Sequence, residues 1–170
     1  MSEITSVNNI LVLIALGFAV FTDLKVKKVD NRFVVGIFII GILAQIFVHG
    51  FSGIVLMASA FSTAVALGLP LYLMKVFGGG DFKLLLAVST LLDWKAVIVV
   101  TLASLFWGAI LGIFRVAFQG DIKSVFTNLL SVFLRNNAHI QKLHAMPFTV
   151  AILFGFLSHL TLSQVGWELL

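Results

Sequence analysis

The stretch Gly78-Gly79-Gly80-Asp81-Phe82-Lys83 places a carboxylate directly after three glycines, where one long apolar segment ends and another begins. An aspartate is costly at membrane depth, and charged residues found there usually line a polar cavity and have a function. Asp23 stands in a comparable place, at the end of the first apolar segment. We therefore expect a fold that brings Asp23 and Asp81 together.

The composition is that of a membrane protein. Of the 170 residues, 61% are hydrophobic and 11% are charged, whereas about a quarter of the residues of a soluble domain are charged. The apolar segments are continuous, unlike the alternating stretches of about ten residues in a barrel. The sequence predicts an all-α, polytopic membrane bundle that forms a single domain over residues 1–170.

Several kinds of chemistry are disfavoured by the residues present. Cysteine is absent, which excludes disulfides, a thiolate zinc site and a cysteine nucleophile. The histidines are scattered without metal-ligand spacing, so we expect no metal and no cofactor; they are His49, His139, His144 and His159. The net charge of +4 reflects cations placed for membrane orientation, and we expect no nucleic-acid partner.

Charged residues, glycines and prolines divide the chain into six apolar segments, which predict about six transmembrane helices. They cover about 10–22, 33–48, 54–77, 82–92, 96–118 and 148–162. The first segment lacks a basic leader and a small-residue cleavage site, so we expect a retained helix. Pro70 should kink the third segment, the glycines at 78–80 should form a tight turn, and Gly108-x-x-x-Gly112 permits close helix packing in the fifth.

The polar stretch between the last two segments contains an amphipathic pattern at 121–135. Its apolar residues recur every three or four positions, which favours a helix lying in the membrane interface. Both a packing helix and a gate remain open for this stretch.

The distribution of Lys and Arg predicts the orientation. With the N-terminus outside and six crossings, all but one of these cations fall on the inner side, as the positive-inside rule requires. The outer side receives Lys95, and the inner side receives Lys25, Lys27, Lys28, Arg32, Lys75, Lys83, Arg115, Lys123, Arg135 and Lys142. Both aspartates then lie towards the cytoplasm.

Helix rise predicts their depth. At 1.5 Å per residue, Asn9 to Asp23 spans about 21 Å and Asp81 to Asp93 spans about 18 Å, both short of the roughly 30 Å hydrocarbon thickness. If Asn9 and Asp93 mark the outer interface, each aspartate lies below the cytosolic headgroups. A first helix that begins earlier, at Ile4, would move Asp23 towards the cytosol.

Two carboxylates at similar depth favour a hydrolytic site. Such a pair shares one proton, so its ionised member can take a proton from water while the protonated member polarises a peptide carbonyl. Taken singly, Asp81 is also a favoured helix N-cap, and Asp23 is also an ordinary interfacial residue beside a basic loop.

Three stretches resemble one protein family. Gly78-x-Gly80-Asp81-x-Lys83 resembles the GxGD signature of membrane aspartyl proteases, and specifically the prepilin peptidase branch. The run from Asp23 to Asn31 is similar to that family's first catalytic motif, although Asp30 stands where the family usually has proline. Pro147-Phe148 with Gly155 is similar to the opening of its last helix. The short form resembles the peptidases of tight-adherence (Flp-type) pilus systems, and N-methylation is not expected.

The resemblance implies a function and a set of residues. Asp23 and Asp81 would be the catalytic pair, and the residues that bind substrate or shape the site would be Gly78, Gly79, Gly80, Lys83 and Asn31. The partners would be the lipid bilayer and type IV pilin-like precursors, cut after a leader glycine at the cytoplasmic face of the inner membrane. The plain interpretation of Lys83 is a cytosolic-side anchor whose side chain snorkels to the headgroups, and Asp30 is expected to be solvated.

Two other functions remain open on the sequence. A small transporter or proton-relay subunit also buries carboxylates, but it predicts acids in both halves of the bilayer, whereas these lie towards one side. A catalytically silent assembly protein of a pilus or secretion system could retain the same residues. The sequence leaves the oligomeric state open.

Overall fold

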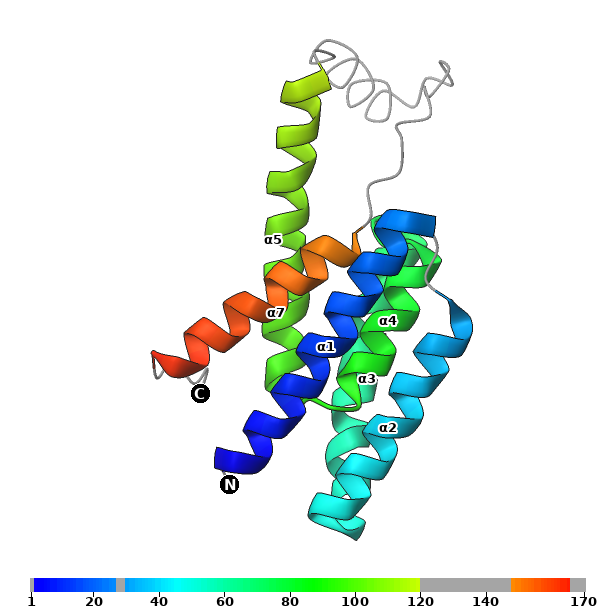
Figure 1. Ribbon diagram of the computed structural model, residues 1–170, viewed down its shortest axis with the longest axis vertical. Coiled ribbons are helices and arrows are strands. Elements are labelled where there is room, and N and C mark those ends of the chain that lie inside the picture. Colours follow the sequence, from blue (N-terminus) through cyan, green and yellow to red (C-terminus); the bar gives the residue numbers. More distant parts are fainter. Residues whose placement is uncertain (1, 27–29, 120–147, 166–170) are drawn as a thin grey trace.

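The computed structural model describes residues 2–26, 30–119 and 148–165, and its regular elements there are all helices (Figure 1). They are α1 (Ser2–Val26), α2 (Asn31–His49), α3 (Phe51–Leu73), α4 (Gly79–Ser89), α5 (Trp94–Gln119) and α7 (Thr149–Gln164). Successive helices run in opposite directions along the bundle. The predicted all-α membrane bundle is confirmed.

Four of these helices are long and apolar enough to cross a membrane. The qualifying stretches are Val7–Val26, Asn31–His49, Phe51–Leu73 and Trp94–Phe114. With 11 and 16 residues, α4 and α7 are about 16 Å and 24 Å long, short of the roughly 30 Å hydrocarbon layer. The prediction of about six transmembrane helices is wrong because it counted every apolar segment as a crossing. The interfacial helix predicted for 121–135 lies outside the described residues.

The first helix is longer than its apolar segment. It begins at Ser2 and continues without a break through Asn9 to Val26. Polar residues do not end it: the Thr22 hydroxyl donates to the Ala19 carbonyl at 2.9 Å, within the same helix. Asp23 is therefore a residue of α1, and Asn9 marks no helix end from which a depth can be measured.

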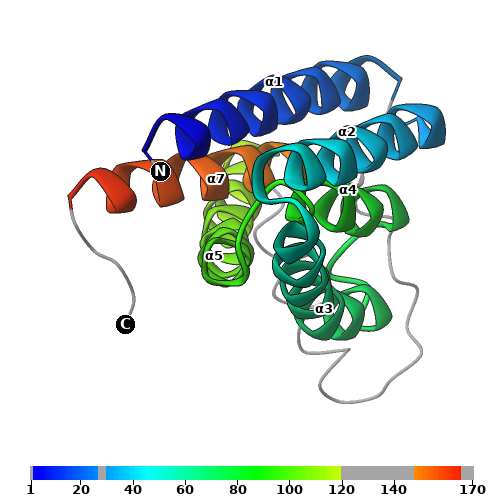
Figure 2. The same cartoon turned by 90° about the horizontal axis from the view of Figure 1, so that it is seen from below.

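The short helix α4 lies between α2 and α3 (Figure 2). Four of its apolar side chains are almost completely buried, namely Leu84, Leu85, Ala87 and Val88. Glycines let the neighbouring helices approach: a Cβ at Gly68 of α3 would lie 2.9 Å from the Phe82 ring, and one at Gly41 of α2 would overlap Thr90. Because lipid is as apolar as these side chains, such close packing supplies much of the association energy.

The connection from α3 to α4 turns at a lysine, which corrects the expectation of a turn at the glycines. Helix α3 ends at Leu73, within one turn of Pro70. Lys75 then adopts a left-handed conformation, with φ of 60°, and the backbone N–H groups of Val76 and Phe77 donate to the Leu71 carbonyl. Gly78 is extended, and the next two glycines begin α4.

The last described helix, α7, crosses α5 obliquely and packs against it (Figure 1). A Cβ at Gly155 would lie 2.7 Å from the Val100 carbonyl oxygen and 2.8 Å from the Ser104 nitrogen, so the two backbones nearly touch. Gly108 accommodates the ring of Phe148, whereas a Cβ at Gly112 would meet no atom of the described residues within 4 Å outside its own stretch of helix. The predicted Gly-x-x-x-Gly packing therefore holds only for Gly108, and its partner is an aromatic ring.

Candidate active site

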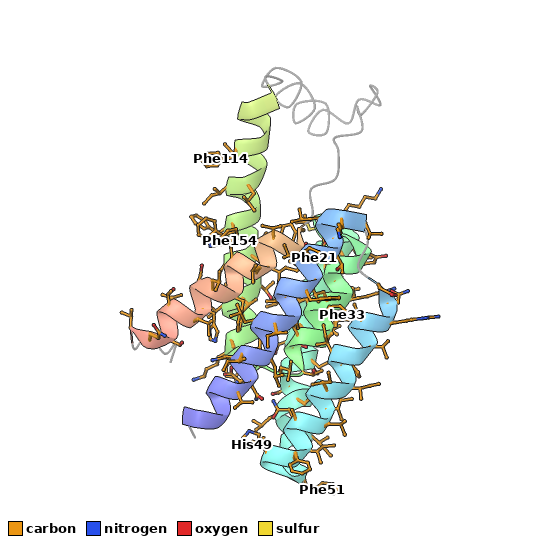
Figure 3. The ribbon with its side chains drawn as sticks, viewed as in Figure 1. Phe21, Phe33, His49, Phe51, Phe114 and Phe154 are labelled. Carbon is orange, nitrogen blue, oxygen red and sulfur yellow. The ribbon has the colours of Figure 1, made fainter. Side chains whose placement is uncertain are left out.

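Three helix ends meet at one end of the bundle. They are the end of α1, the start of α4 and the start of α7 (Figure 1). Figure 3 marks the same end of the molecule with Phe21 near the end of α1, and the opposite end with His49 and Phe51. Because the helices alternate in direction, residues far apart in the sequence, Asp23, Asp81 and Thr149, come to the same level.

Asp23 is buried against α7. Its side chain is 9% exposed, and the fully buried Thr149 hydroxyl donates a hydrogen bond to its Oδ2 at 2.6 Å. Short bonds of this kind are typical of a hydroxyl that donates to a charged carboxylate. Asp23 is therefore not an interfacial residue exposed beside a basic loop, and its partner lies 126 positions further along the chain.

Asp81 is the third residue of α4, so the expectation that it caps the helix as the N-cap residue is wrong. The N-cap is Gly78, whose backbone N–H donates to Asp81 Oδ2 at 3.2 Å. A side chain at position 78 would place its Cβ 2.9 Å from that oxygen. The glycine thus leaves space for the carboxylate in its present position, and its backbone angles are ordinary.

The two carboxylates share one environment. Burial raises the pKa of Asp81 from 3.8 to about 6, and the charge of Asp23 adds to this rise. The backbone N–H groups of Gly78, Asp81 and Thr149 oppose the rise, since they favour the charged carboxylate. Thr149 therefore acts on both acids, through its hydroxyl on Asp23 and through its backbone on Asp81.

The raised pKa of Asp81 predicts that this residue destabilises the protein at neutral pH. Between pH 4 and 6 the folded state holds a proton that the unfolded state has released, so folding stability falls as the pH rises through this window. Asp81→Asn removes the effect, and we expect the variant to be more stable than the parent at pH 7.5 by on the order of 2 kcal/mol. Thermal midpoints in detergent at pH 4 and 7.5 measure the difference, most of which should be lost at pH 4. A variant that is less stable than the parent at pH 7.5 would contradict this.

Aromatic rings tie the start of α7 to the chain segment that carries Asp81. The Phe77 ring, 2% exposed, lies against the ring of Phe148, with centroids 4.8 Å apart. These residues directly precede Gly78 and Thr149 in the sequence. The ring of Tyr72 in α3 also stacks on the ring of Phe82 in α4, with centroids 5.4 Å apart. The loop before Asp81 is therefore held by side-chain packing on α3 and α7.

The remaining predicted site residues lie at the surface of this end. Lys83 Nζ donates to Asn31 Oδ1 at 3.2 Å, an exposed contact that joins α4 to α2. Asp30 is exposed and caps α2, where its Oδ1 accepts a hydrogen bond from the Arg32 backbone N–H. Gly79 and Gly80 form the first turn of α4. Lys83 and Asn31 are thus brought together across α4 and α2.

The chemistry available at this site is proton transfer by two carboxylates. Within the described ranges, no three His, Asp or Glu side chains gather as a metal-ligand set would. A buried carboxylate with a raised pKa can hold a proton, and its ionised neighbour can accept one from water. Such a pair can hydrolyse an amide.

A comparison with known families agrees with this geometry. The model of the type IV leader peptidase family matches residues 10–113. The chain belongs to this family. The match contains Asp23, Asp81 and the glycines before Asp81, but it ends before α7 begins. No curated protein and no solved structure matches the chain. The family expected from the sequence motifs is confirmed, and this leader peptidase family member is a membrane protein.

The sequence did not reveal the residue that joins the two acids. Thr149 follows Pro147 and Phe148 directly, and that motif was noted only as a helix opening. A threonine is common in membrane helices, where its hydroxyl usually bonds the helix backbone, so its type carried no signal. Its position at the start of a helix, where no preceding turn can accept its hydrogen bond, was the clue.

Proposed function

We propose that this member of the type IV leader peptidase family is an intramembrane aspartyl endopeptidase. It removes the leader peptide from type IV pilin-like precursors by general acid–base hydrolysis. One observation carries the proposal: two buried carboxylates from different helices interact electrostatically and share the neighbour Thr149. Residues 1–170 act as a single peptidase domain and need no cofactor.

In the proposed reaction, Asp23 is the ionised member and takes a proton from water. The water oxygen attacks the scissile carbonyl, and Asp81, which holds the shared proton because its pKa is raised, donates it to the carbonyl oxygen. The tetrahedral gem-diol then collapses: the proton on Asp23 passes to the leaving amine as the C–N bond breaks, and one gem-diol hydroxyl returns its proton to Asp81. The two acids end with one proton in total, as they began.

The site is proposed to face the cytoplasm, with the N-terminus on the opposite side of the inner membrane. The ends of α1 and α3 and the starts of α2 and α4 lie at one end of the bundle. This end carries Lys25, Arg32, Lys75 and Lys83, whereas the start of α5 at the other end carries Lys95, and this asymmetry supports the orientation. Lys83 and Asn31, joined at 3.2 Å, then lie at the cytoplasmic rim. There they shape the entrance for an extended peptide, which must be unwound before its amide is accessible.

The test is cleavage of a prepilin-like precursor by the purified protein in detergent or vesicles. We expect one cut on the C-terminal side of the leader glycine, located by mass spectrometry. A matched precursor in which that glycine is replaced by leucine should not be cut. Absence of cleavage of the glycine precursor would contradict the proposal and favour a proton-relay or silent assembly role.

A further inference from the structure

We propose that Thr149 is a positioning residue of this site, whose hydroxyl orients the Asp23 carboxylate for its reaction with water. This inference rests on the proposed function and extends it to a residue outside the family match, which ends at 113. Thr149 touches no substrate in this proposal. It acts by fixing the base.

The direction of its hydrogen bond sets Thr149 apart from other threonines of the described chain. Most of them donate to a carbonyl of their own helix three or four residues earlier; these are Thr22, Thr63, Thr90, Thr101 and Thr161. Thr149 begins α7, so no earlier helical turn can accept its proton. Its hydroxyl instead crosses to α1 and donates to Asp23 Oδ2 at 2.6 Å.

Burial makes this bond consequential. The Thr149 side chain is fully buried and Asp23 is 9% exposed, so loss of the hydroxyl would leave the carboxylate oxygen without this donor in a poorly hydrated place. The bond from Thr149 fixes the orientation of the Asp23 carboxylate, and the acceptor sites that it leaves unused are available to the attacking water.

The helix behind Thr149 is held firmly enough to position a carboxylate. Gly155 brings α7 against the α5 backbone, and the Phe148 ring is seated on Gly108. The ring of Phe148 also contacts Phe77, at the segment that leads to Asp81. A side chain that orients a reactive group must itself be locked by packing, and Thr149 meets this condition.

The test compares three substitutions in the cleavage assay. Thr149→Val keeps the shape and removes the hydroxyl, and we expect kcat to fall about ten- to a hundredfold, as for a lost hydrogen bond to a charged group. KM should stay unchanged because Thr149 does not contact the substrate. Thr149→Ser keeps the hydroxyl and should retain most of the parent kcat. The kcat of Thr149→Ala should fall as far as that of Thr149→Val.

A matched control is Thr101→Val, another buried threonine, whose hydroxyl donates to the Val97 carbonyl of its own helix at 2.7 Å. It should cleave like the parent. If Thr149→Val does not fold, the comparison of kcat between Thr149→Ser and Thr149→Ala tests the inference, since these variants differ only in the hydroxyl. Cleavage by Thr149→Val at the parent rate, or equal losses in serine and alanine, would overturn the inference. A parent that does not cleave would instead overturn the proposed function.

Discussion

Asp23→Asn and Asp81→Asn should each remove cleavage of a prepilin-like precursor, with kcat falling by about a hundred- to ten-thousandfold. This is the range typical of a lost general acid or base. Asparagine preserves shape and burial, but it can neither accept the proton of water nor deliver one to the carbonyl. Because the two acids act as a unit, the double variant should fall little further than either single one. Single-turnover cleavage in detergent measures all three.

The chain offers two matched controls for these variants. Asp30 and Asp93 are also aspartates, and both are exposed. Asn at position 30 can still cap α2, so Asp30→Asn and Asp93→Asn should cleave like the parent. Retained cleavage in Asp23→Asn or Asp81→Asn would contradict the two-acid mechanism. A loss in the Asp30 or Asp93 variant would show that the assay reports charge or folding instead.

Much of the helix layout could be predicted from the sequence, because apolar segments and their charged ends are local signals. Helices α2 and α5 begin and end within two residues of the predicted segments. The number of membrane crossings could not be predicted, because it depends on the residue at which each helix ends. Helix α4 ends at Ser89, where the Thr90 hydroxyl and backbone bond back to Ala87 and the chain turns, and no apolar-residue count shows this.

The glycine run before Asp81 predicted correctly that one helix ends and another begins there, but the tight turn expected at the glycines is wrong. The expected turn lies at Lys75, with its positive φ, although lysine is not a residue that predicts a left-handed turn. Of the three glycines, Gly78 matters here, because its backbone approaches the Asp81 carboxylate where a Cβ would lie 2.9 Å from Oδ2. The position of Thr149 at a helix start hints at a partner outside its own helix. The sequence could not identify that partner as Asp23, because the contact spans 126 positions and depends on how α7 crosses α5.

That crossing can be tested directly at Gly155, where the α5 and α7 backbones nearly touch. In Gly155→Val the Cβ would lie 2.7 Å from the Val100 carbonyl oxygen and 2.8 Å from the Ser104 nitrogen. These are backbone atoms of a helix and cannot rotate away, so α7 must move as a body. We expect a loss of about 3 kcal/mol in stability, at the upper end of the cost of overpacking, measured as a lower thermal midpoint.

Gly112→Val is the matched control, because it makes the same exchange in α5 where, in the part of the chain that the structure describes, the added Cβ meets no atom within 4 Å outside its own stretch of helix. We expect its stability to stay within about 0.5 kcal/mol of the parent. Since α7 carries Thr149 to Asp23, Gly155→Val should also lose cleavage under conditions where it remains folded, whereas Gly112→Val should keep it. Equal stability of the two variants would contradict the observed crossing, and full cleavage by a destabilised Gly155→Val would show that the site does not depend on the position of α7.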